Sequence, residues 1–391
     1  MYLQNLSLQH FKNYSKAEFN FSKHLNFLTG MNGSGKTNAL DAIHYLCLGK
    51  SYFHYSDQNT LQHETNFFRL EGKFMDDLPH SGILDEDKLS FQENGKVNQA
   101  APEELRITCA FQAGNRKELS KNGIFYQRIV DHVGLIPVVM VTPDDQLLID
   151  EGSEERRRFI DNTLSQIDHS YLEILLAYNK ILQQRNAALK QFAFKGTPDR
   201  PLIESFDVQL TAAGQKIFTA RRSYLLKMIP MMGKFYELLS GGREEISATY
   251  ESVCRKEDLL TALHKSFEKD CVTQRTNTGI HRDDIDFFFN GRSLKKFGSQ
   301  GQKKCFLMAL KFAQYELIRE EKNKTPLLLL DDLFDKLDEG RSKNILKLVS
   351  ENGFGQVFIT DTNDARVRNF IGKTKKESRH FTVDRGIVSN A

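Results

Sequence analysis

The N-terminal residues alternate between apolar and polar side chains, which is the period of a strand with one buried face. The alternation covers "YLQNLSLQHF", and "KHLNFLTG" predicts a second strand that ends just before Met31. A helix is predicted from Lys36 to Leu48. Further strands are predicted between residues 66 and 130, with Asn-Gly hairpin turns at Asn94–Gly95 and Asn122–Gly123; they are "FFRLEGKF", "LSFQENGK", "RITCAFQ" and "GIFYQRIV".

The character of the chain changes after the apolar run "GLIPVVMVTPDD", which predicts a buried strand that leaves its sheet at two carboxylates. From about Glu154 to Leu263 the chain is predicted to be mostly helical. Two long segments on either side of the linker "FKGTPDRP" hold apolar residues at helical spacing: Tyr171, Ile174, Leu175, Tyr178 and Leu182 in the first, and Phe206, Leu210, Ala213, Ile217 and Tyr224 in the second.

Strand patterns return from about residue 272. "IDFFFNGRSL" predicts a hairpin, "GQKKCFLMALKFAQYELIREE" a long helix, and "TPLLLLDD" and "GQVFIT" two short buried strands with a helix between them. These elements predict an α/β protein whose mixed sheet is interrupted by a helical lobe. The predicted parts are residues 1–150, with the phosphate loop and β hairpins, residues 151–271, the helical lobe, and residues 272–391, the returning part of the first domain.

Composition narrows the class of protein. The chain has 391 residues, 40% of them hydrophobic and 27% charged, with a net charge of +3, which is ordinary for a globular protein and permits nucleic-acid contact without requiring it. The five cysteines form no CxxC pair, which argues against a disulfide framework or zinc site and favours a reducing compartment. Without a signal-peptide pattern or a long apolar run, we expect a cytoplasmic protein without a membrane span.

The segment "GMNGSGKT" matches the phosphate-loop pattern G-x-x-x-x-G-K-[ST] at every fixed position, between a predicted strand and a predicted helix. Its glycines allow backbone N–H groups to face phosphate oxygens, and the helix N-terminus adds partial positive charge. Lys36 is expected to reach the β- and γ-phosphates, and Thr37 to bind Mg²⁺. The alternative is a glycine turn before an ordinary helix. The predicted ATP-binding residues are Gly30, Met31, Asn32, Gly33, Ser34, Gly35, Lys36 and Thr37.

Four leucines followed by Asp331 and Asp332 predict a buried strand that ends in two carboxylates. In a phosphate-loop protein this is the Walker B position, where Asp331 would bind the magnesium through water and Asp332 would orient or deprotonate the attacking water. Asp is one methylene shorter than the Glu that many such proteins have at the second position, so we expect slow hydrolysis. The alternative is simple capping of the next helix by the two aspartates.

The loop "FGSQGQ" lies between these motifs and opens a predicted helix. This order of motifs resembles that of ATP-binding-cassette ATPases, whose signature loop has the form L-S-G-G-Q. Gly298, Ser299, Gln300, Gly301 and Gln302 occupy the five positions, two of which differ. The resemblance implies that Ser299, Gly301 and Gln302 contact the γ-phosphate held by a second subunit. It also places a D-loop at Asp335 to Asp338. Thr360 stands where many cassettes have a switch histidine, and Asp361 and Thr362 are the candidate substitutes.

Several longer stretches resemble the RecF family of bacterial recombination-repair ATPases, which are relatives of SMC proteins without the long coiled coil. They are "LQNLSLQHFKNY", "TPDDQLLIDEGSEERRRFID", "YNKILQQRNAALK", "TGIHRDDIDFFFNGRSLKKFGSQGQKK" and "LLLLDDLFDKLD". The resemblance runs nearly end to end and is weakest at residues 75 to 105, where an acidic loop is inserted. In this family, the position of Lys12 and Asn13 lies near the nucleotide.

The resemblance implies an ATP-dependent DNA-binding protein of DNA repair and replication. Two subunits would enclose two ATP molecules and close on DNA, and weak DNA-dependent hydrolysis would release it. The implied partners are single- or double-stranded DNA, junctions between the two, and RecR-like and RecO-like proteins that help load RecA at gaps. SOS induction is the associated response. The alternatives are a cassette ATPase clamp of another DNA or defence system, a transport cassette, and a scaffold with an inactive site.

Lysines and arginines are the candidates for contacts to DNA phosphates, because such contacts give sequence-independent and salt-sensitive binding. The alternative for each is a solvated surface or an internal ion pair: Arg158 is spaced to pair with Glu154 or Glu155, and Arg156 or Arg157 to reach Asp144. His281 and Arg282 are expected either to sense nucleotide or to end a strand. The DNA candidates are Arg156, Arg157, Arg158, Lys180, Arg185 and Lys190 in the helical lobe, and Arg116, Lys117, Lys121, Lys303 and Lys304 elsewhere.

Overall fold

A computed structural model describes residues 1–54, 56–76, 103–195, 199–241, 244–332, 339–351 and 353–390. The chain divides into two compact units, each built from separate parts of the sequence. The first comprises Met1–His132, Leu327–Asp331 and Gly353–Ala391, and the second comprises Val133–Pro326 and Asp332–Asn352. The domain boundaries predicted after residues 150 and 271 do not coincide with the limits of these two units, and they stay a prediction.

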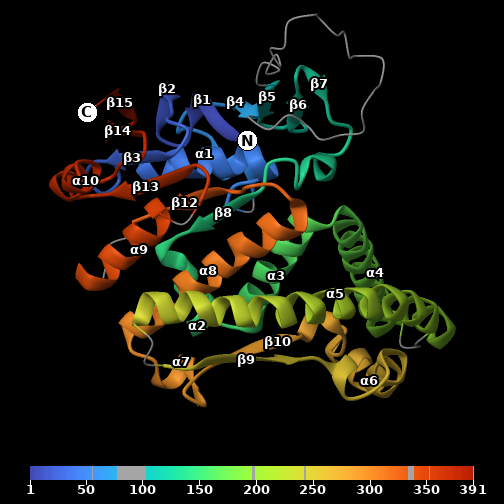
Figure 1. Cartoon of the computed structure of the whole chain (residues 1–391). Helices are drawn as coiled ribbons and strands as arrows, with labels where there is room; N and C mark the ends of the chain where they lie inside the picture. Colours follow the sequence, from blue (N-terminus) through green and yellow to red (C-terminus); the bar gives the residue numbers. More distant parts are fainter. Residues whose placement is uncertain are drawn as a thin grey trace, which may run out of the picture. The chain divides into compact units, whose positions relative to one another are not determined.

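The first unit contains two sheets and helix α1 (Figure 1). One sheet is antiparallel, with the strand order β2-β1-β4-β5-β6-β7. Alternate residues of β4 are buried, whereas β1, whose register against β4 shifts between Leu3 and Asn5, buries Leu3, Leu6, Leu8 and Phe11 and departs from the strict alternation that its sequence predicts. Its strands are β1 (Tyr2–Phe11), β2 (Tyr14–Asn20), β4 (Phe67–Asp76), β5 (Glu103–Gln112), β6 (Glu118–Lys121) and β7 (Ile124–Phe125).

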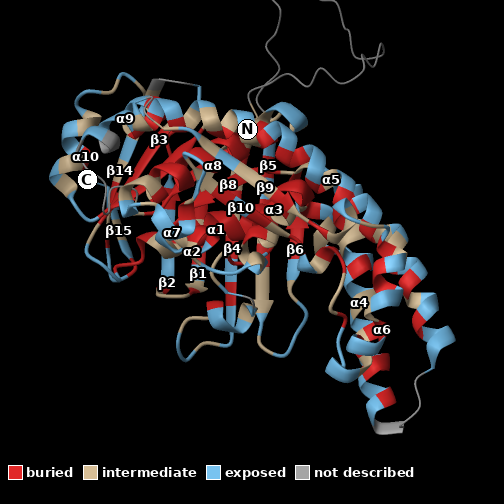
Figure 2. Cartoon of the chain, turned by 90° about the horizontal axis from the view of Figure 1, so that it is seen from below, coloured by how far each residue is buried: buried red, intermediate tan, exposed pale blue. Residues whose placement is uncertain are grey.

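The second sheet of this unit contains parallel strands in the order β14-β3-β13-β12, with β15 antiparallel at the edge beside β14. Helix α1 (Lys36–Leu48) begins where predicted, and it ends at Gly49, whose φ of 70° lies in the left-handed region that favours glycine. β3 and most of α1 are buried (Figure 2). The remaining elements are β3 (Leu25–Thr29), β12 (Leu327–Leu330), β13 (Val357–Asp361), α10 (Asp364–Ile371), β14 (Ser378–Asp384), β15 (Ile387–Asn390), η1 (Asp57–Thr60) and η3 (Ile129–His132).

The second unit is mainly helical. It contains the 41-residue helix α5 (Arg200–Ser240), which contacts α4 and α8, and a small antiparallel sheet in the order β11-β10-β9. The other elements are β8 (Val138–Val141), η4 (Pro143–Gln146), α2 (Leu147–Asp150), α3 (Ser153–Ile167), α4 (His169–Lys195), β9 (Ile246–Glu251), η5 (Val253–Arg255), α6 (Leu259–Thr273), η6 (Ile280–Arg282), β10 (Asp284–Phe289), β11 (Arg292–Ser293), α7 (Leu294–Phe297), α8 (Gln300–Lys322) and α9 (Glu339–Glu351).

The predicted α/β class, with mixed sheets and helices, is confirmed. The Asn122–Gly123 hairpin is confirmed too, with both residues at positive φ as a tight two-residue turn requires. The strand predicted over "GIFYQRIV" is wrong beyond Phe125, because Ile129–His132 form a 3-10 turn closed by an Arg128–Asp131 ion pair. The helical prediction is wrong at Ile246–Glu251, where pairing with β10 makes a strand. The Asn94–Gly95 turn lies outside the described residues.

Candidate nucleotide-binding site

The parallel strands of the first unit bring three sequence motifs to one edge. β3 and β13 run side by side, with Thr29 opposite Asp361, and Leu330 of β12 lies opposite Ile359. All three strands therefore end at the same edge of the sheet. The phosphate loop follows β3, Asp331 follows β12, and Thr360 lies near the end of β13. This edge is where ligands bind in open α/β sheets.

The phosphate loop has a backbone that only glycine accommodates at two of its positions. Gly30 has φ 154°, and a Cβ atom there would lie 2.2 Å from the Val383 carbonyl oxygen. Gly35 has φ 122°, and a Cβ atom there would lie 2.6 Å from the Asn13 side chain. At these two positions the loop is packed too closely for any larger residue, which explains the two fixed glycines of the pattern.

Hydrogen bonds from outside hold the loop in this shape. Asn13 Nδ2 and the Gly386 backbone N–H both donate to the Ser34 carbonyl at 2.9 Å, and Tyr14 Oη donates to the Gly35 carbonyl at 2.9 Å. Burial raises the pKa of Tyr14, so its hydroxyl keeps the proton that it donates. The prediction placed Asn13 near the nucleotide, and Asn13 does contact the loop. The sequence patterns did not indicate the roles of Tyr14 and Gly386.

Lys36 and Ser34 supply polar atoms suited to an anion. The Lys36 ammonium is 2.9 Å from the Gly30 carbonyl oxygen and 3.0 Å from that of Met31, and the residue is only 4% exposed. The hydroxyl of Ser34 is buried and has no hydrogen-bond partner among the residues that the structure describes. An unpartnered buried hydroxyl costs free energy unless a ligand satisfies it. These groups fit a bound phosphate.

Thr37 and Asp331 form the expected pair beside the loop. Thr37 Oγ1 lies 2.9 Å from each oxygen of the Asp331 carboxylate, which is almost fully buried. Thr360 Oγ1 donates to the same carboxylate at 2.8 Å. A hydroxyl and a carboxylate are the hard oxygen donors that Mg²⁺ prefers, so the donor set fits this ion. Asp332, the predicted water-orienting residue, is half-buried and has a strained φ of 43°.

Lys12, the other predicted nucleotide neighbour, is occupied by an ion pair. Its ammonium lies 2.7 Å from the Asp41 carboxylate on α1 and 5.0 Å from the ring centroid of Phe53. Asp41 is fully buried and also accepts hydrogen bonds from Ser51 Oγ and the Tyr52 N–H, each at 2.7 Å. The contacts give Lys12 a structural role, and its approach to a nucleotide stays a prediction.

The signature loop in the second unit forms a capping box at the start of α8. The Gln302 N–H donates to Ser299 Oγ at 3.2 Å, and Gln302 Oε1 accepts from the Ser299 N–H at 2.8 Å. Gln302 Nε2 also donates to Glu244 at 2.8 Å. Both the oxygen and the nitrogen of the Gln302 side-chain amide therefore form hydrogen bonds within the protein. Ser299 is exposed, and its hydroxyl still has a proton to donate.

The segment after β8 supports the same loop. Gln146 Nε2 donates to Gln300 Oε1 at 2.9 Å, and Lys303 Nζ lies 2.6 Å from Asp150. Burial acts to raise the pKa of Asp150, but hydrogen bonds from Lys303 and Gln146 outweigh it, so the pKa lies below its ordinary value. Gln300, one of the two departures from the signature pattern, thus has a partner of its own. The predicted D-loop at Asp335 to Asp338 lies outside the described residues.

Three of the DNA candidates are buried in internal ion pairs, so the prediction of a phosphate contact is wrong for them. Arg185 has no exposed surface and binds Asp207 and Asp270 at 2.7 and 2.8 Å. Arg156 makes a two-pronged pair with Asp284, rather than with the expected Asp144. Lys303 is held by Asp150. Burying a charge requires such partners, and the sequence pattern does not reveal them.

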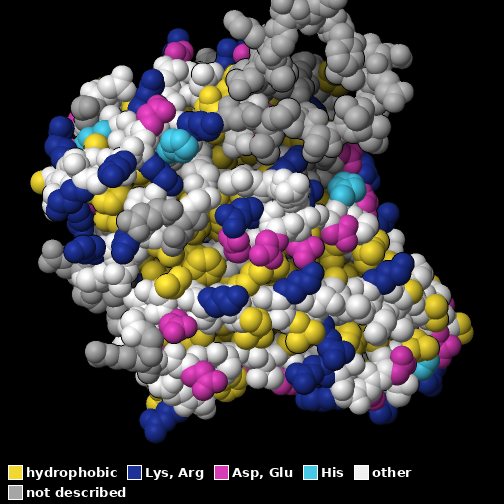
Figure 3. All heavy atoms as spheres, viewed as in Figure 1, with side chains coloured by type: hydrophobic (Ala, Val, Ile, Leu, Met, Phe, Trp, Pro, Cys, Tyr) yellow, Lys and Arg dark blue, Asp and Glu magenta, His cyan; other side chains and the backbone are white. Residues whose placement is uncertain are grey.

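The other candidates differ in exposure. Arg158 pairs with Glu154 and Glu155 as the alternative predicted, Arg157 donates to the Asp283 carbonyl, and Lys117 pairs with Asp57. In the face shown in Figure 3, Lys and Arg side chains are interspersed with Asp and Glu. The candidates whose residues are exposed are Lys180, Lys190, Arg116 and Lys121. DNA contacts at these four stay a prediction.

His281 forms hydrogen bonds with two residues inside the second unit. Its Nε2 lies 3.1 Å from the Thr276 carbonyl, which can only accept, so Nε2 carries the proton and Nδ1 accepts from the Tyr178 hydroxyl at 2.9 Å. Burial lowers the pKa of His281 to about 4. His281 lies in the 3-10 turn η6, between α6 and the start of β10, so it does not end a strand, and a role in sensing nucleotide stays a prediction.

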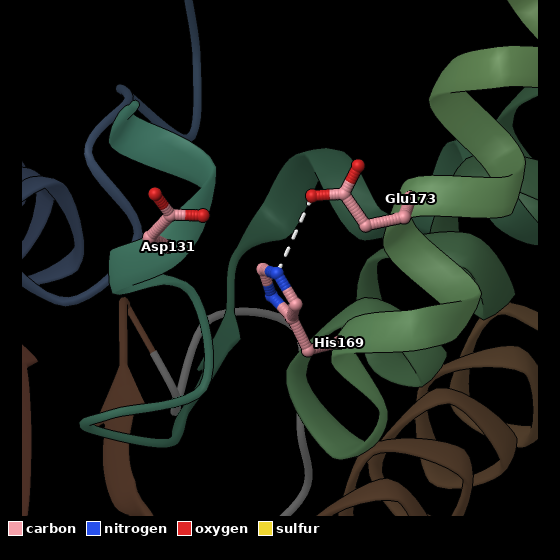
Figure 4. Close-up of side chains that lie close together, drawn as sticks. All are labelled: Asp131, His169 and Glu173. Carbon is pink, nitrogen blue, oxygen red and sulfur yellow. Dashed lines mark ion pairs between the residues drawn. The ribbon is translucent and has the colours of Figure 1, made fainter. Parts of the chain in front are cut away.

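Within the part of the chain that the structure describes, a histidine–glutamate pair at the start of α4 also resembles metal ligands. His169 Nε2 and Glu173 Oε1 lie 3.4 Å apart, one helical turn from each other (Figure 4). Both side chains are more than a third exposed, and such i, i+4 pairs are common on helices. We assign this pair no metal. Among the described residues, no helix has the length and apolar character to span a membrane.

Comparison with known proteins agrees with this geometry. The family model described as the RecF/RecN/SMC N terminal domain matches residues 2–384. The chain is 38% identical to the DNA replication and repair protein RecF of Flavobacterium johnsoniae, over 98% of this chain and 100% of that protein. It is 39% identical to the RecF protein of Cytophaga hutchinsonii, over 100% of this chain and 97% of that protein.

Solved structures give the same result. A structure of the recombination mediator protein RecF with ATP, in the RecFOR pathway, aligns with a TM-score of 0.84 and 28% identity, covering 100% of this chain and 97% of that one. An SMC head bound to the C-winged helix domain of ScpA aligns with a TM-score of 0.54 at 16% identity, which indicates the shared ATPase-head fold alone. The chain belongs to the RecF family, within the wider group of RecF, RecN and SMC proteins.

Proposed function

We propose that this protein is an ATP-dependent DNA-binding switch of recombinational repair. The observation that supports this most is the pairing of a complete phosphate loop with Thr37 and Asp331, in a chain of the RecF family. The relatives are named DNA replication and repair proteins, and one related structure contains ATP. We extend both properties to this chain.

ATP would bind with its phosphates in the loop from Gly30 to Thr37. Lys36 would turn its ammonium from the Gly30 and Met31 carbonyls to the β- and γ-phosphates. The buried Ser34 hydroxyl would gain a phosphate partner. Thr37 would coordinate Mg²⁺ directly, and Asp331 would bind it through water. The ion, when bound, neutralises charge on the β- and γ-phosphates.

The second half of each site would come from another copy of the chain. Ser299 uses its oxygen to cap α8 but keeps its hydroxyl proton, which would be donated to the γ-phosphate of the partner. Gly301 would let the backbone approach, and the N-terminus of α8 would add partial positive charge. Two ATP molecules would thus join two subunits around DNA. A single copy would be nearly inert.

Hydrolysis to ADP and phosphate would be slow and would open the dimer. Asp332 would orient or deprotonate the attacking water, but its short side chain reaches less far than Glu. DNA would bind through exposed lysines and arginines, and the ATPase activity would be weak and DNA-dependent. The protein would act in the cytoplasm with RecR-like and RecO-like partners, help to load RecA where single and double strands meet, and contribute to replication and SOS induction.

Light scattering with and without ATP, and with and without DNA, tests this proposal. The wild type should be a monomer without ATP and a dimer with it, and DNA should favour the dimer. Ser299→Arg should bind ATP but remain monomeric, because a long cation blocks the approach of the second phosphate loop. Ser205→Arg, at an exposed position on α5, is the matched control and should behave as the wild type. Dimerisation that ignores ATP, or that persists in Ser299→Arg, contradicts the model.

A further inference from the structure

The end of β13 holds a threonine where many cassette ATPases have a switch histidine. Thr360 is fully buried, and its Oγ1 donates to Asp331 Oδ1 at 2.8 Å. The side chain therefore turns toward the carboxylate that Thr37 also contacts at 2.9 Å. Two hydroxyls from two different elements, the start of α1 and the end of β13, meet on one buried carboxylate.

The neighbouring candidates at this strand end are directed elsewhere. Asp361 accepts from the Asn363 N–H at 2.9 Å and lies 3.2 Å from Arg366 Nε, so its carboxylate faces the start of α10. Thr362 is exposed. Neither takes the place of an imidazole near the phosphate loop. Thr360 is the residue of this strand end that contacts the proposed magnesium site.

We propose that Thr360 is a positioning residue that fixes the Asp331 carboxylate for magnesium. This inference rests on the proposed function. It concerns the ion's outer surroundings, because Thr360 contacts Asp331, which would bind the ion through water, rather than the ion or the nucleotide. Threonine suits the role, since its branched Cβ restricts χ1 and holds the hydroxyl in one direction. A hydrogen bond to a carboxylate is stronger than one between neutral groups.

Thr37 and Thr360 both contact Asp331, but of the two we propose that only Thr37 binds the ion. When Thr37 turns its oxygen to the ion, the orientation of Asp331 no longer depends on Thr37 alone. Thr360 lies on β13, which pairs with β12 on one side and β3 on the other. It would keep its hydrogen bond to Asp331 Oδ1. A hydroxyl of this kind cannot relay charge as a histidine can. At this position the chain therefore supports the metal rather than sensing the γ-phosphate.

The test is a magnesium titration of nucleotide binding, followed with a fluorescent, slowly hydrolysed ATP analogue. Thr360→Val removes the hydroxyl at nearly constant shape, and Thr360→Ser keeps it. Loss of an outer-shell partner typically weakens metal affinity by about 10- to 100-fold. We expect Thr360→Val to raise the magnesium concentration for half-maximal binding by about 10-fold at least, and Thr360→Ser to stay within about threefold of the wild type. Binding in EDTA should be unchanged.

A stability control separates positioning from general damage. Thr163 is also fully buried, and its hydroxyl donates to the Phe159 carbonyl at 2.8 Å within α3 of the second unit. Thr163→Val should lower the unfolding temperature without changing the magnesium midpoint. A Thr360→Val protein with the wild-type midpoint overturns the inference. If the wild type itself binds the analogue without any magnesium dependence, the proposed function fails instead, so the two failures are distinct.

Discussion

The phosphate loop and the signature loop of the second unit differ in whether their polar side chains already have hydrogen-bond partners within the chain. In the phosphate loop, the Ser34 hydroxyl is buried without a partner among the described residues, and Lys36 donates to the Gly30 and Met31 carbonyls of the loop. In the signature loop, Gln302 and Gln300 are bonded to Glu244 and Gln146. The first region is arranged for a ligand within one chain. In the second region, these glutamines already have partners, and the Ser299 hydroxyl proton is the one that we propose is donated to another subunit.

The stretch "QQRNAALK" extends this contrast. Arg185 binds Asp207 and Asp270, and the adjacent Asn186 accepts from both the N–H and the hydroxyl of Thr276 at 2.7 and 2.8 Å. The segment before β10 is thus fastened to α4. A family stretch that is rich in polar residues can mark internal bonding instead of a binding surface. Burial of the side chains distinguishes internal bonding from a binding surface, and the sequence does not show burial.

The largest effect that we expect comes from Arg185→Ala. Removing one member of a buried ion network leaves two aspartates without their cation, which typically costs about 3–5 kcal/mol. We expect the second unit to unfold earlier in urea, and hydrogen exchange by mass spectrometry would assign the loss to α4, α5 and α6. DNA binding at low temperature should change little while the fold persists.

Arg158→Ala is the matched control, because it removes an arginine whose pairs with Glu154 and Glu155 both lie at the protein surface, where water reaches the charged groups. Exposed pairs contribute at most about 1 kcal/mol. Equal stability of the two variants would mean that the Arg185 network does not hold the unit together. A selective loss of DNA affinity in Arg185→Ala, without loss of stability, would restore Arg185 as a DNA contact.

Lys36→Met should produce the opposite pattern, a loss of binding without a loss of stability. A hydrogen bond to a charged group contributes about 1.5–3 kcal/mol, which corresponds to a roughly 10- to 100-fold weaker affinity for ATP. Calorimetric titration with a non-hydrolysable analogue measures this. The control is Lys16→Met, an exposed lysine of the same unit, which should bind as the wild type does. A large stability loss in Lys36→Met would make the loop a structural feature.

The sequence predicted the elements with strong periodic patterns best. α1 and β1 have the predicted bounds, and α8 follows its signature loop. β2, β14 and β15 were missed, because short half-exposed strands depend on pairing with distant partners for their stability. The contact between Thr37 and Asp331, which lie 294 positions apart, followed from motif chemistry and strand order.

Contacts that depend on packing could not be predicted. The Tyr14 hydroxyl and the Gly386 N–H meet the phosphate loop only because β1, β2 and β14–β15 fold around it. The burial of Arg185 is likewise set by which face of α4 meets α5 and α6. The sequence alone does not distinguish an arginine on a helix surface from one that is buried in a core. Thr360 was recognised as a departure from a pattern, but its contact with Asp331 required the structure.

The smallest effect, and the most selective test of the contrast, is expected at Ser299. Ser299→Ala removes the cap of α8, which typically costs about 1 kcal/mol, and also removes the hydroxyl proposed for the partner's ATP. Ser299→Asp separates the two roles, because aspartate caps a helix as well as serine does but places a negative charge where the γ-phosphate would approach. We therefore expect Ser299→Asp to keep the wild-type unfolding temperature and to lose ATP-dependent dimerisation in light scattering. Were Ser299→Asp to dimerise with ATP as the wild type does, the serine would be a helix cap only, and the signature loop would be no different from the other self-satisfied motifs of the second unit.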